Sequence, residues 1–326
     1  MKVVITNHIL DAGVKLLKDA GYEVDMAAPE EYPSREEVLA RIPGAEAICT
    51  SLSDRVDAEF LDTAGKQLKI ISNVAVGFNN IDLDECARRG IITTHTPDVL
   101  TEATADLAFA LIMAVTRRLP EAERYLRAGH HWQWNMSLMV GSAIQNKTFG
   151  LIGAGRIGKA VARKVKAFDM NIVYSGNHPM DSEDEKALEA EFVPLDELLK
   201  RSHVVSLHCP YRPENHHMIG EEQIRMMPKG SYLINTARGQ LVDEEAMIRA
   251  LDDGHLAGVG LDVFEDEPHV PEGLIRENAV LLPHIGSATI ETRNTMSELV
   301  ANNVLKALAG ERPLTPIPNS YLPENL

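Results

Sequence analysis

The feature that most constrains the fold of this chain is a glycine-rich turn between an apolar strand and an amphipathic helix. Residues 149–158 read FGLIGAGRIG. In a dinucleotide-binding βαβ unit, the first glycine permits a tight turn, the second lets the backbone approach a pyrophosphate, and the third lets the helix pack closely on the strand. Gly153, Gly155 and Gly158 have this spacing, and the following helix N-terminus would offer free N–H groups to phosphates. Because both flanking elements are present, the pattern predicts a Rossmann site rather than an ordinary glycine turn.

Short apolar strands alternate with helical stretches along the chain, which is typical of βαβ units and parallel sheets. Strands are expected at residues 3–6, 22–26, 47–51, 70–73, 91–94, 148–152, 171–174, 204–208, 231–235, 258–262 and 280–282. Helices are expected at residues 12–20, 35–41, 83–89, 101–128 and 291–309. A length of 326 residues favours two domains.

The domain boundary is expected to be discontinuous. The polar, proline-containing tail 311–326 is predicted to pack back onto the first domain. Residues 1–98 and 288–326 would then form one domain, and residues 99–287 the dinucleotide-binding one. Segment 101–128 is predicted as one long helix, bent or broken near Pro120. Its middle is apolar nearly all round, so it must be covered on every side, either in the core or at a subunit interface.

Composition excludes several classes of protein. With 32 Lys and Arg against 48 Asp and Glu, the formal net charge is −16, which argues against a nucleic-acid partner but not against an anionic substrate in a local pocket. The longest apolar run, residues 107–115, is too short to span a bilayer, and no signal-peptide pattern opens the chain. Cys49, Cys86 and Cys209 show no CxxC spacing. We expect a cytoplasmic protein in a reducing compartment, with no membrane partner.

The end of the second strand of the dinucleotide unit bears on the choice of cofactor. An acidic residue roughly 20 positions after the first glycine usually binds the ribose 2′-hydroxyl of NAD. Here the strand ends in Ser175, Gly176, Asn177 and His178, with no Asp or Glu. Repulsion of a 2′-phosphate is therefore absent, and these side chains could donate hydrogen bonds to one, although no Arg is there to clamp it. The sequence favours NADP over NAD; alternatively, these are plain turn residues and both cofactors are used.

Three polar residues follow strands downstream of the glycine turn. Arg238 and His284 each follow an apolar strand, so they are expected at the carboxyl edge of the sheet, where open α/β sheets bind ligands. An Arg can bind an anion and polarise a carbonyl, and a His can protonate a developing alkoxide. Glu267 could pair with His284 and raise its pKa by favouring the imidazolium. Taken singly, these residues also fit a surface Arg, a turn His and a solvated acidic turn.

The segments around these residues match a known family. The sequences NTARG at 235–239, GLDVFEDEP at 260–268, LPHIGS at 282–287 and NVAVGFNNID at 73–82, together with GAGRIG at 153–158, resemble the D-isomer-specific 2-hydroxyacid dehydrogenases over essentially the whole chain. Among these the chain looks most like glyoxylate/hydroxypyruvate reductases. The resemblance implies two Rossmann-like α/β domains, a flavodoxin-like substrate domain and a doubly wound parallel-sheet dinucleotide-binding domain. It also implies reduction of glyoxylate or hydroxypyruvate by NAD(P)H.

Site residues also follow from the resemblance. It makes Arg238 the substrate-binding cation, His284 the acid/base and Glu267 the residue that orients His284, and it pairs Asp262 with the nicotinamide carboxamide, where a strand-end cap is the alternative. The implied cofactor contacts are Thr104, Gly153, Gly155, Arg156, Ile157, Gly158, Ser175, Gly176, Asn177, His208, Cys209, Pro210, Thr236, Ala237, Arg238, Asp262, His284 and Gly286.

Substrate contacts are expected from the first domain. The resemblance implies that backbone amides at Val76 and Gly77 bind the carboxylate, with Leu52 and Ser53 lining the mouth and Leu52 limiting side-chain size. Neighbouring Asn79 and Asn80 are interpreted as turn residues.

A homodimer through helix 101–128 and the loop after it is expected. In glyoxylate/hydroxypyruvate reductases a Trp of this loop reaches the partner's active site, and the match falls on Trp134, although the GxWxxW spacing is altered here. The alternative for Trp132 and Trp134 is core filling.

Two pairs of adjacent histidines, 130–131 and 216–217, raise the question of a metal. Adjacent histidines rarely bind one ion alone, no carboxylate or thiolate cluster is expected beside them, and hydride transfer needs no metal. Solvated loops are therefore predicted. Two other functions stay open on the same fold: a D-lactate or other D-2-hydroxyacid dehydrogenase, and a NAD(H)-sensing corepressor.

Overall fold

The computed structural model describes residues 1–324. It divides into two compact units, one formed by Met1–Leu100 together with the chain from Ser287 onward, and one formed by Thr101–Gly286. Among the described residues, no helix combines the length and the apolar character needed to cross a membrane.

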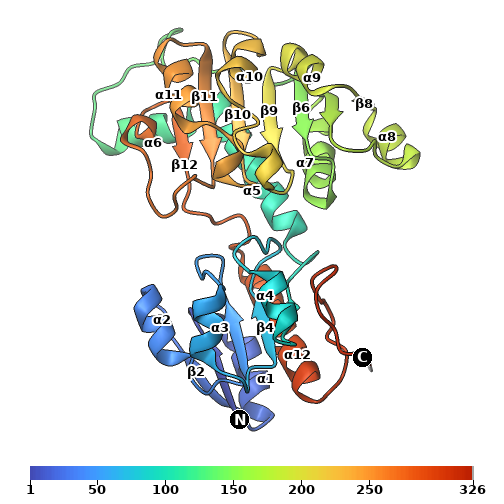
Figure 1. Ribbon diagram of the computed structural model, residues 1–326. Helices are drawn as coiled ribbons and strands as arrows, with labels where there is room; N and C mark the ends of the chain where they lie inside the picture. The colour runs from blue at the N-terminus through green and yellow to red at the C-terminus, as the bar shows by residue number, and fades with distance from the viewer. Residues whose placement is uncertain (325–326) are drawn as a thin grey trace. The chain divides into compact units, whose positions relative to one another are not determined.

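The first unit is built on a parallel five-stranded sheet (Figure 1). Its strands are β1 (Lys2–Ile5), β2 (Glu23–Met26), β3 (Ala47–Thr50), β4 (Ile70–Asn73) and β5 (Ile92–Thr94). Its helices are α1 (Asp11–Asp19), α2 (Arg35–Arg41), α3 (Ala58–Ala64), α4 (Leu83–Arg88) and α12 (Ile290–Leu308). The strand order β2-β1-β3-β4-β5 is the flavodoxin-like order, as predicted.

Each face of this sheet is buried under helices. On one face, residues of α1 and α12 such as Val14, Leu17 and Val300 pack into one apolar core. On the other, residues of α2, α3 and α4 form a second. The C-terminal tail packs on this unit, because Ile317 N donates to Thr93 O at 3.0 Å. Helix α3 was not among the expected elements, although it buries Phe60, Leu61 and Ala64. Its sequence signal is the Asp57 cap, which accepts from Phe60 N.

The second unit is built on a parallel seven-stranded sheet in the order β12-β11-β10-β9-β6-β7-β8 (Figure 1). Its strands are β6 (Thr148–Ile152), β7 (Asn171–Ser175), β8 (Ala190–Phe192), β9 (Val204–Leu207), β10 (Ser231–Asn235), β11 (Leu256–Leu261) and β12 (Ala279–Leu281). Its α-helices are α5 (Thr101–Thr116), α6 (Leu119–Arg127), α7 (Arg156–Lys166), α8 (Ser182–Leu188), α9 (Leu195–Arg201), α10 (Glu221–Met226) and α11 (Glu244–Asp252), with short 3-10 turns at Pro213–Asn215, Gly239–Leu241 and Glu272–Leu274.

This sheet is doubly wound, as predicted. Residues of α5 and α7 fill the core on one face, and residues of α9, α10 and α11 fill the core on the other. Strand β6 lies between β7 and β9, so the chain reverses its direction of winding there. In open α/β sheets the crevice at the carboxyl end of such a reversal point is the place for a ligand.

The segment 101–128 is broken near Pro120, as predicted. It is two helices, α5 and α6, and they separate at Arg118, which adopts a left-handed conformation with φ of 53°. Pro120 lies in the first turn of α6, where a missing N–H is tolerated, so it starts the second helix rather than bending a single one. Helix α5 is largely buried, whereas no residue of α6 is.

Candidate functional site

The glycine turn lies where the sheet reverses its winding. Gly153 N donates to Ser175 O of β7 at 2.9 Å, and His208 N donates to Ile152 O at 2.7 Å, so the turn is fixed to both neighbouring strands. Gly153 has φ of 93°, and a Cβ there would lie 2.5 Å from Cys209 N. Only glycine fits this position, because both the backbone conformation and the close approach exclude a side chain.

The residues around the glycine turn fit a dinucleotide. A Cβ built on Gly155 meets no atom within 4 Å, so the backbone at the start of α7 faces open space. The hydroxyl of Thr236, on the loop after β10, is buried and has no hydrogen-bond partner among the described residues. Because buried polar groups are normally satisfied, this hydroxyl is suited to a bound molecule. Arg156 and Ile157 open α7, and Gly158 packs under the turn.

The loop after β9 contributes a neutral histidine. His208 Nε2 lies 2.8 Å from Ser206 Oγ, and burial lowers the pKa of His208 to about 3. Cys209 and Pro210 follow it, and burial raises the pKa of the Cys209 thiol to about 11. The thiol is therefore protonated at neutral pH, which excludes it as a nucleophile.

The loop after β7 is open. Ser175 ends the strand, paired with Ile152 of β6, and Gly176 and Asn177 are exposed. The residues of this loop that are predicted to bind the ribose are therefore accessible, next to the glycine turn.

His284 and Glu267 form a direct pair. His284 Nδ1 lies 2.8 Å from Glu267 Oε2, and Phe264 N donates to Glu267 Oε1 at 3.1 Å. Burial acts to raise the pKa of Glu267 and is the largest single influence, but the hydrogen bond and charge of His284, the Phe264 amide and Arg238 together hold this pKa below 4.5. The carboxylate is thus ionised at neutral pH and fixes one ring nitrogen, which leaves Nε2 for a ligand.

His284 has a left-handed backbone, with φ of 53°. Its turn is held by Asp262, whose Oδ1 and Oδ2 accept from Ile285 N at 2.7 Å and Gly286 N at 2.8 Å. Asp262 is buried, and this burial raises its pKa against the opposing effect of the two amides and His284. It therefore caps the turn after β12 from the end of β11, the alternative considered for this residue.

Arg238 is held by the strand that precedes it. Asn235 Nδ2 donates to Arg238 O at 2.8 Å, Asn235 Oδ1 accepts from Ala237 N at 3.0 Å, and Arg238 Nη1 donates to Ala237 O at 2.6 Å. Burial lowers the pKa of Arg238, and the Glu267 carboxylate opposes this. The next residue, Gly239, lies directly against the Phe264 backbone, where a Cβ would approach to 1.9 Å. The loop of Arg238 and the segment that carries Glu267 are therefore packed together.

The predicted substrate residues Leu52, Ser53, Val76 and Gly77 lie on the loops after β3 and β4, which are neighbours in the first sheet. Asn80 joins these loops, since its Nδ2 donates to Ser51 O and Asp54 O, both at 3.0 Å. It is more than the turn residue expected from the sequence.

Two further residues hold these loops. Buried Asp54 accepts from Ser51 N and from Thr6 Oγ1, both at 2.6 Å. His95 Nδ1 lies 2.9 Å from Val76 O. The contacts of Asp54 with Thr6 and of His95 with Val76 join residues that are far apart in the sequence. No local sequence pattern predicts them.

The remaining expectations have different outcomes. Thr104 lies at the start of α5 beside Gly286, where a Cβ on Gly286 would lie 3.3 Å from Thr104 Cγ2. Trp132 and Trp134 are 54% and 74% exposed, so the core-filling alternative is wrong within this chain. The expectation that no carboxylate lies beside the histidine pair 216–217 is also wrong, because Glu265 Oε1 lies 2.8 Å from His217 Nε2. Sequence reasoning missed this because 48 residues separate the two.

Comparison with known proteins agrees with this arrangement. Residues 109–286 match the profile of the D-isomer specific 2-hydroxyacid dehydrogenase, NAD binding domain. The chain is 46% identical over 320 residues to a glyoxylate reductase of Thermococcus onnurineus, covering 96% of this chain and 95% of that protein.

Solved structures agree in fold. A glyoxylate reductase from Paecilomyes thermophila has a TM-score of 0.85 at 35% identity, with 98% of each chain covered. An NADPH-dependent glyoxylate/hydroxypyruvate reductase from Sinorhizobium meliloti has a TM-score of 0.84 at 33% identity, with 97% of each chain covered.

Proposed function

This chain belongs to the D-isomer specific 2-hydroxyacid dehydrogenases, and we propose that it reduces glyoxylate, and hydroxypyruvate as a second substrate, to the 2-hydroxy acid. The observation that carries the proposal is the pairing of Glu267 with His284 at 2.8 Å on the loops after β11 and β12, in the same unit as the glycine turn. The curated glyoxylate reductases that resemble the chain along 96% of its length support the choice of substrate.

The reaction requires hydride and a proton at opposite ends of a carbonyl. A bound nicotinamide dinucleotide would supply the hydride, held by the glycine turn, the start of α7, the loop of Ser175 and the hydroxyl of Thr236. His284 donates the proton from Nε2 to the carbonyl oxygen. Glu267 stabilises the charged ring before this transfer and keeps Nε2 oriented.

Arg238 supplies the cation. Its planar guanidinium binds a carboxylate through two parallel hydrogen bonds and polarises the adjacent carbonyl oxygen. The burial that lowers its pKa also strengthens such contacts, because charges interact more strongly away from water. We assign further recognition of the substrate to the amides of Val76 and Gly77, with Leu52 and Ser53 setting the size of the side chain accepted.

We assign NADPH as the preferred reductant. The support is the absence of a carboxylate at Ser175, together with the exposed Asn177 that could donate to a 2′-phosphate. The similar Sinorhizobium meliloti reductase is described as NADPH-dependent, which agrees with this assignment.

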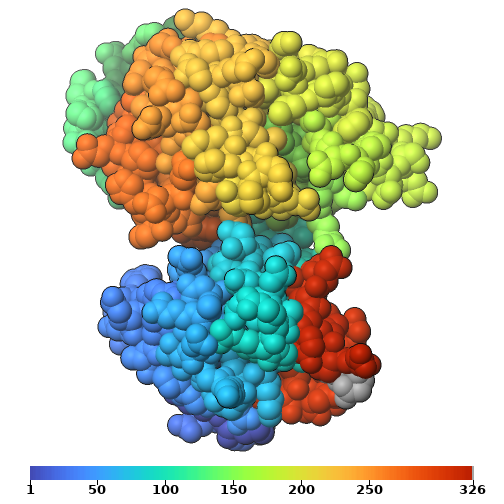
Figure 2. Space-filling model, viewed as in Figure 1, coloured from blue at the N-terminus to red at the C-terminus, as the bar shows by residue number. Residues whose placement is uncertain are grey.

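We also propose a homodimer. Helix α6 and the segment after it carry exposed large apolar side chains: Leu119, Leu126, Trp132, Trp134, Met136 and Val140. Figure 2 shows this segment, in green, at the surface of the second unit. Large exposed apolar groups gathered on one segment mark an interaction surface. In such a dimer Trp134 would contribute to the partner's active site. Sedimentation of the wild type and of Trp134→Ala tests the dimer.

The central test is a panel of 2-keto acids assayed with NADH and with NADPH. We expect the highest kcat/KM for glyoxylate, a lower one for hydroxypyruvate, and a fall in kcat of about 10²–10⁴-fold in His284→Ala with cofactor affinity retained. Preference for pyruvate would make the chain a lactate dehydrogenase. Cofactor binding without turnover of any acid would make it a sensor of the same fold.

A further inference from the structure

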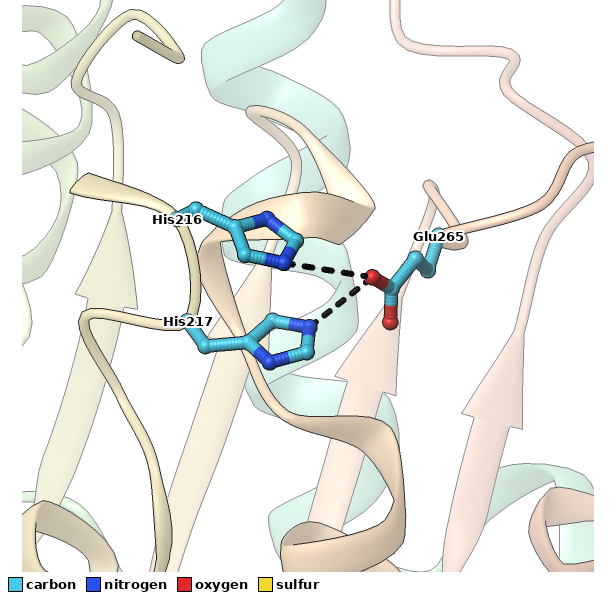
Figure 3. Close-up of side chains that lie close together, drawn as sticks. All are labelled: His216, His217 and Glu265. Atoms are coloured by element: carbon cyan, nitrogen blue, oxygen red, sulfur yellow. Dashed lines mark hydrogen bonds and ion pairs between the residues drawn. The ribbon is translucent and has the colours of Figure 1, made fainter. Parts of the chain in front are cut away.

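Two consecutive histidines and a distant glutamate meet at one point near the carboxyl edge of the second sheet (Figure 3). Glu265 Oε1 lies 2.8 Å from His217 Nε2 and 3.9 Å from His216 Nε2. The two imidazole rings are stacked, with centroids 3.9 Å apart. The three possible ligand atoms lie within 4.8 Å of one another.

We propose that His216, His217 and Glu265 form a binding site for one divalent transition-metal ion such as Zn²⁺. Two imidazole nitrogens and a carboxylate oxygen are a ligand set that Zn²⁺ and its neighbours accept, with bonds of about 2.0–2.2 Å. Ligand atoms spaced as these are need only small side-chain movements to surround an ion. Mg²⁺ and Ca²⁺ are disfavoured, because they require mostly oxygen ligands.

The charge around the site also favours a cation. Glu244 lies next to Glu265, since its Oε1 accepts from Glu265 N at 2.9 Å. Two adjacent carboxylates would offset the charge of a 2+ ion. The side chain of His216 is 45% exposed, which leaves a path for the ion and room for water as a fourth ligand.

The backbone that carries the three ligands is fixed before any metal binds. His217 N donates to Gln240 O at 2.8 Å, and Gln240 Nε2 donates to Glu265 O at 2.7 Å. Gln240 thus ties the two ligand segments together, two residues after Arg238. Because Glu265 precedes Glu267 by two residues, an ion here would fasten the segment that carries the partner of His284.

The test uses the full-length chain without a histidine tag, stripped with a chelator. Co²⁺ is titrated and followed by its visible absorption, and Zn²⁺ by calorimetry and by the melting temperature. We expect one ion per chain, a rise in melting temperature that saturates with Zn²⁺, and no response to Mg²⁺. His217→Ala and Glu265→Ala should weaken Zn²⁺ binding at least about 10-fold. Loss of a residue that only hydrogen-bonds to a metal ligand already lowers metal affinity by about that factor.

Two variants act as controls. Glu265→Gln can still accept a hydrogen bond from His217 but lacks the charge, so it should keep the metal-free melting temperature and lose most of the metal affinity. The double variant His130→Ala/His131→Ala removes the other histidine pair. Among the described residues, this pair is not part of a cluster of possible metal ligands, so the variant should bind Zn²⁺ as the wild type does.

The proposal is overturned if the wild type binds no more Zn²⁺ than His217→Ala, or if removal of the 130–131 pair abolishes binding. These assays contain neither keto acid nor cofactor, so they fail or succeed independently of the proposed reductase activity.

Discussion

Glu267→Gln is the most direct test of how the His284 pair works. The change keeps the size of the side chain and an oxygen that can accept from Phe264 N, but it replaces the carboxylate beside His284 Nδ1 by a neutral amide. Reduction consumes a proton, and in this mechanism the imidazolium supplies it. Without the carboxylate, no opposite charge beside Nδ1 stabilises the ring that donates the proton, so we expect kcat to begin its alkaline fall at lower pH.

The size of the effect follows from the geometry. An opposite charge within about 4–6 Å shifts the pKa of a side chain by about 1–3 units. The side chains of His284 and Glu267 are 29% and 36% exposed, so solvent screening places the effect at the lower end of that range. We therefore expect the pH at which kcat for glyoxylate reduction falls to half its maximum to move down by about one unit. The maximal kcat should fall less than in His284→Ala.

The assay is kcat against pH from roughly 5 to 10 at saturating NADPH and glyoxylate, in buffer containing a chelator. Glu265→Gln is the matched control, because it lies in the same segment and faces His217 at the same 2.8 Å, but it does not touch His284. Its profile should match that of the wild type. An unshifted profile in Glu267→Gln, or an equal shift in both variants, would refute the reasoning.

Four further outcomes are expected. Arg238→Lys should lower kcat/KM for glyoxylate about 10- to 100-fold with NADPH affinity retained, because a point charge cannot form two parallel hydrogen bonds; full activity would contradict this. Ser175→Asp should lower kcat/KM for NADPH at least about 10-fold and leave NADH use equal or better, through repulsion of the 2′-phosphate; an unchanged ratio would show that another residue reads the ribose. Asp262→Asn should lower the melting temperature by roughly 2–8 °C, since one buried backbone N–H loses its acceptor; a change below about 1 °C would argue against its role as a cap. Because the pKa of Glu267 is held below 4.5 in the folded chain, its pairing stabilises the fold above about pH 4.5 and loses this effect as the pH falls through the lower folded value, so the melting temperatures of wild type and Glu267→Gln should converge in acid.

The architecture was accessible from the sequence because its signals are local. The strand–glycine–helix pattern at 149–158 and the alternation of strands and helices are read within short windows, and the structure has both parallel sheets. The polar residues after β10, β11 and β12 could also be located, since parallel strands bring their carboxyl ends to one edge.

Long-range partners could not be located in this way. Glu265 and His217 are 48 residues apart and meet only because their loops follow strands on either side of β10. Asn80 looks like a turn residue until its contacts with Ser51 and Asp54 are seen. The sequence predicts a break near Pro120 but not its exact position at Arg118, because a proline is tolerated in a first helical turn.

The left-handed backbone at His284 limits which residues can occupy this position in any redesign of the enzyme. Asn, Asp and Gly adopt φ near +55° readily, whereas Val, Ile and Thr do so only with strain. In a library of all substitutions at this position, the Asn, Asp and Gly variants should therefore fold but be inactive. The Val, Ile and Thr variants should give less folded protein. His284→Asn thus separates loss of chemistry from loss of the turn, and a designer seeking a binding protein for keto acids without turnover would begin from that variant.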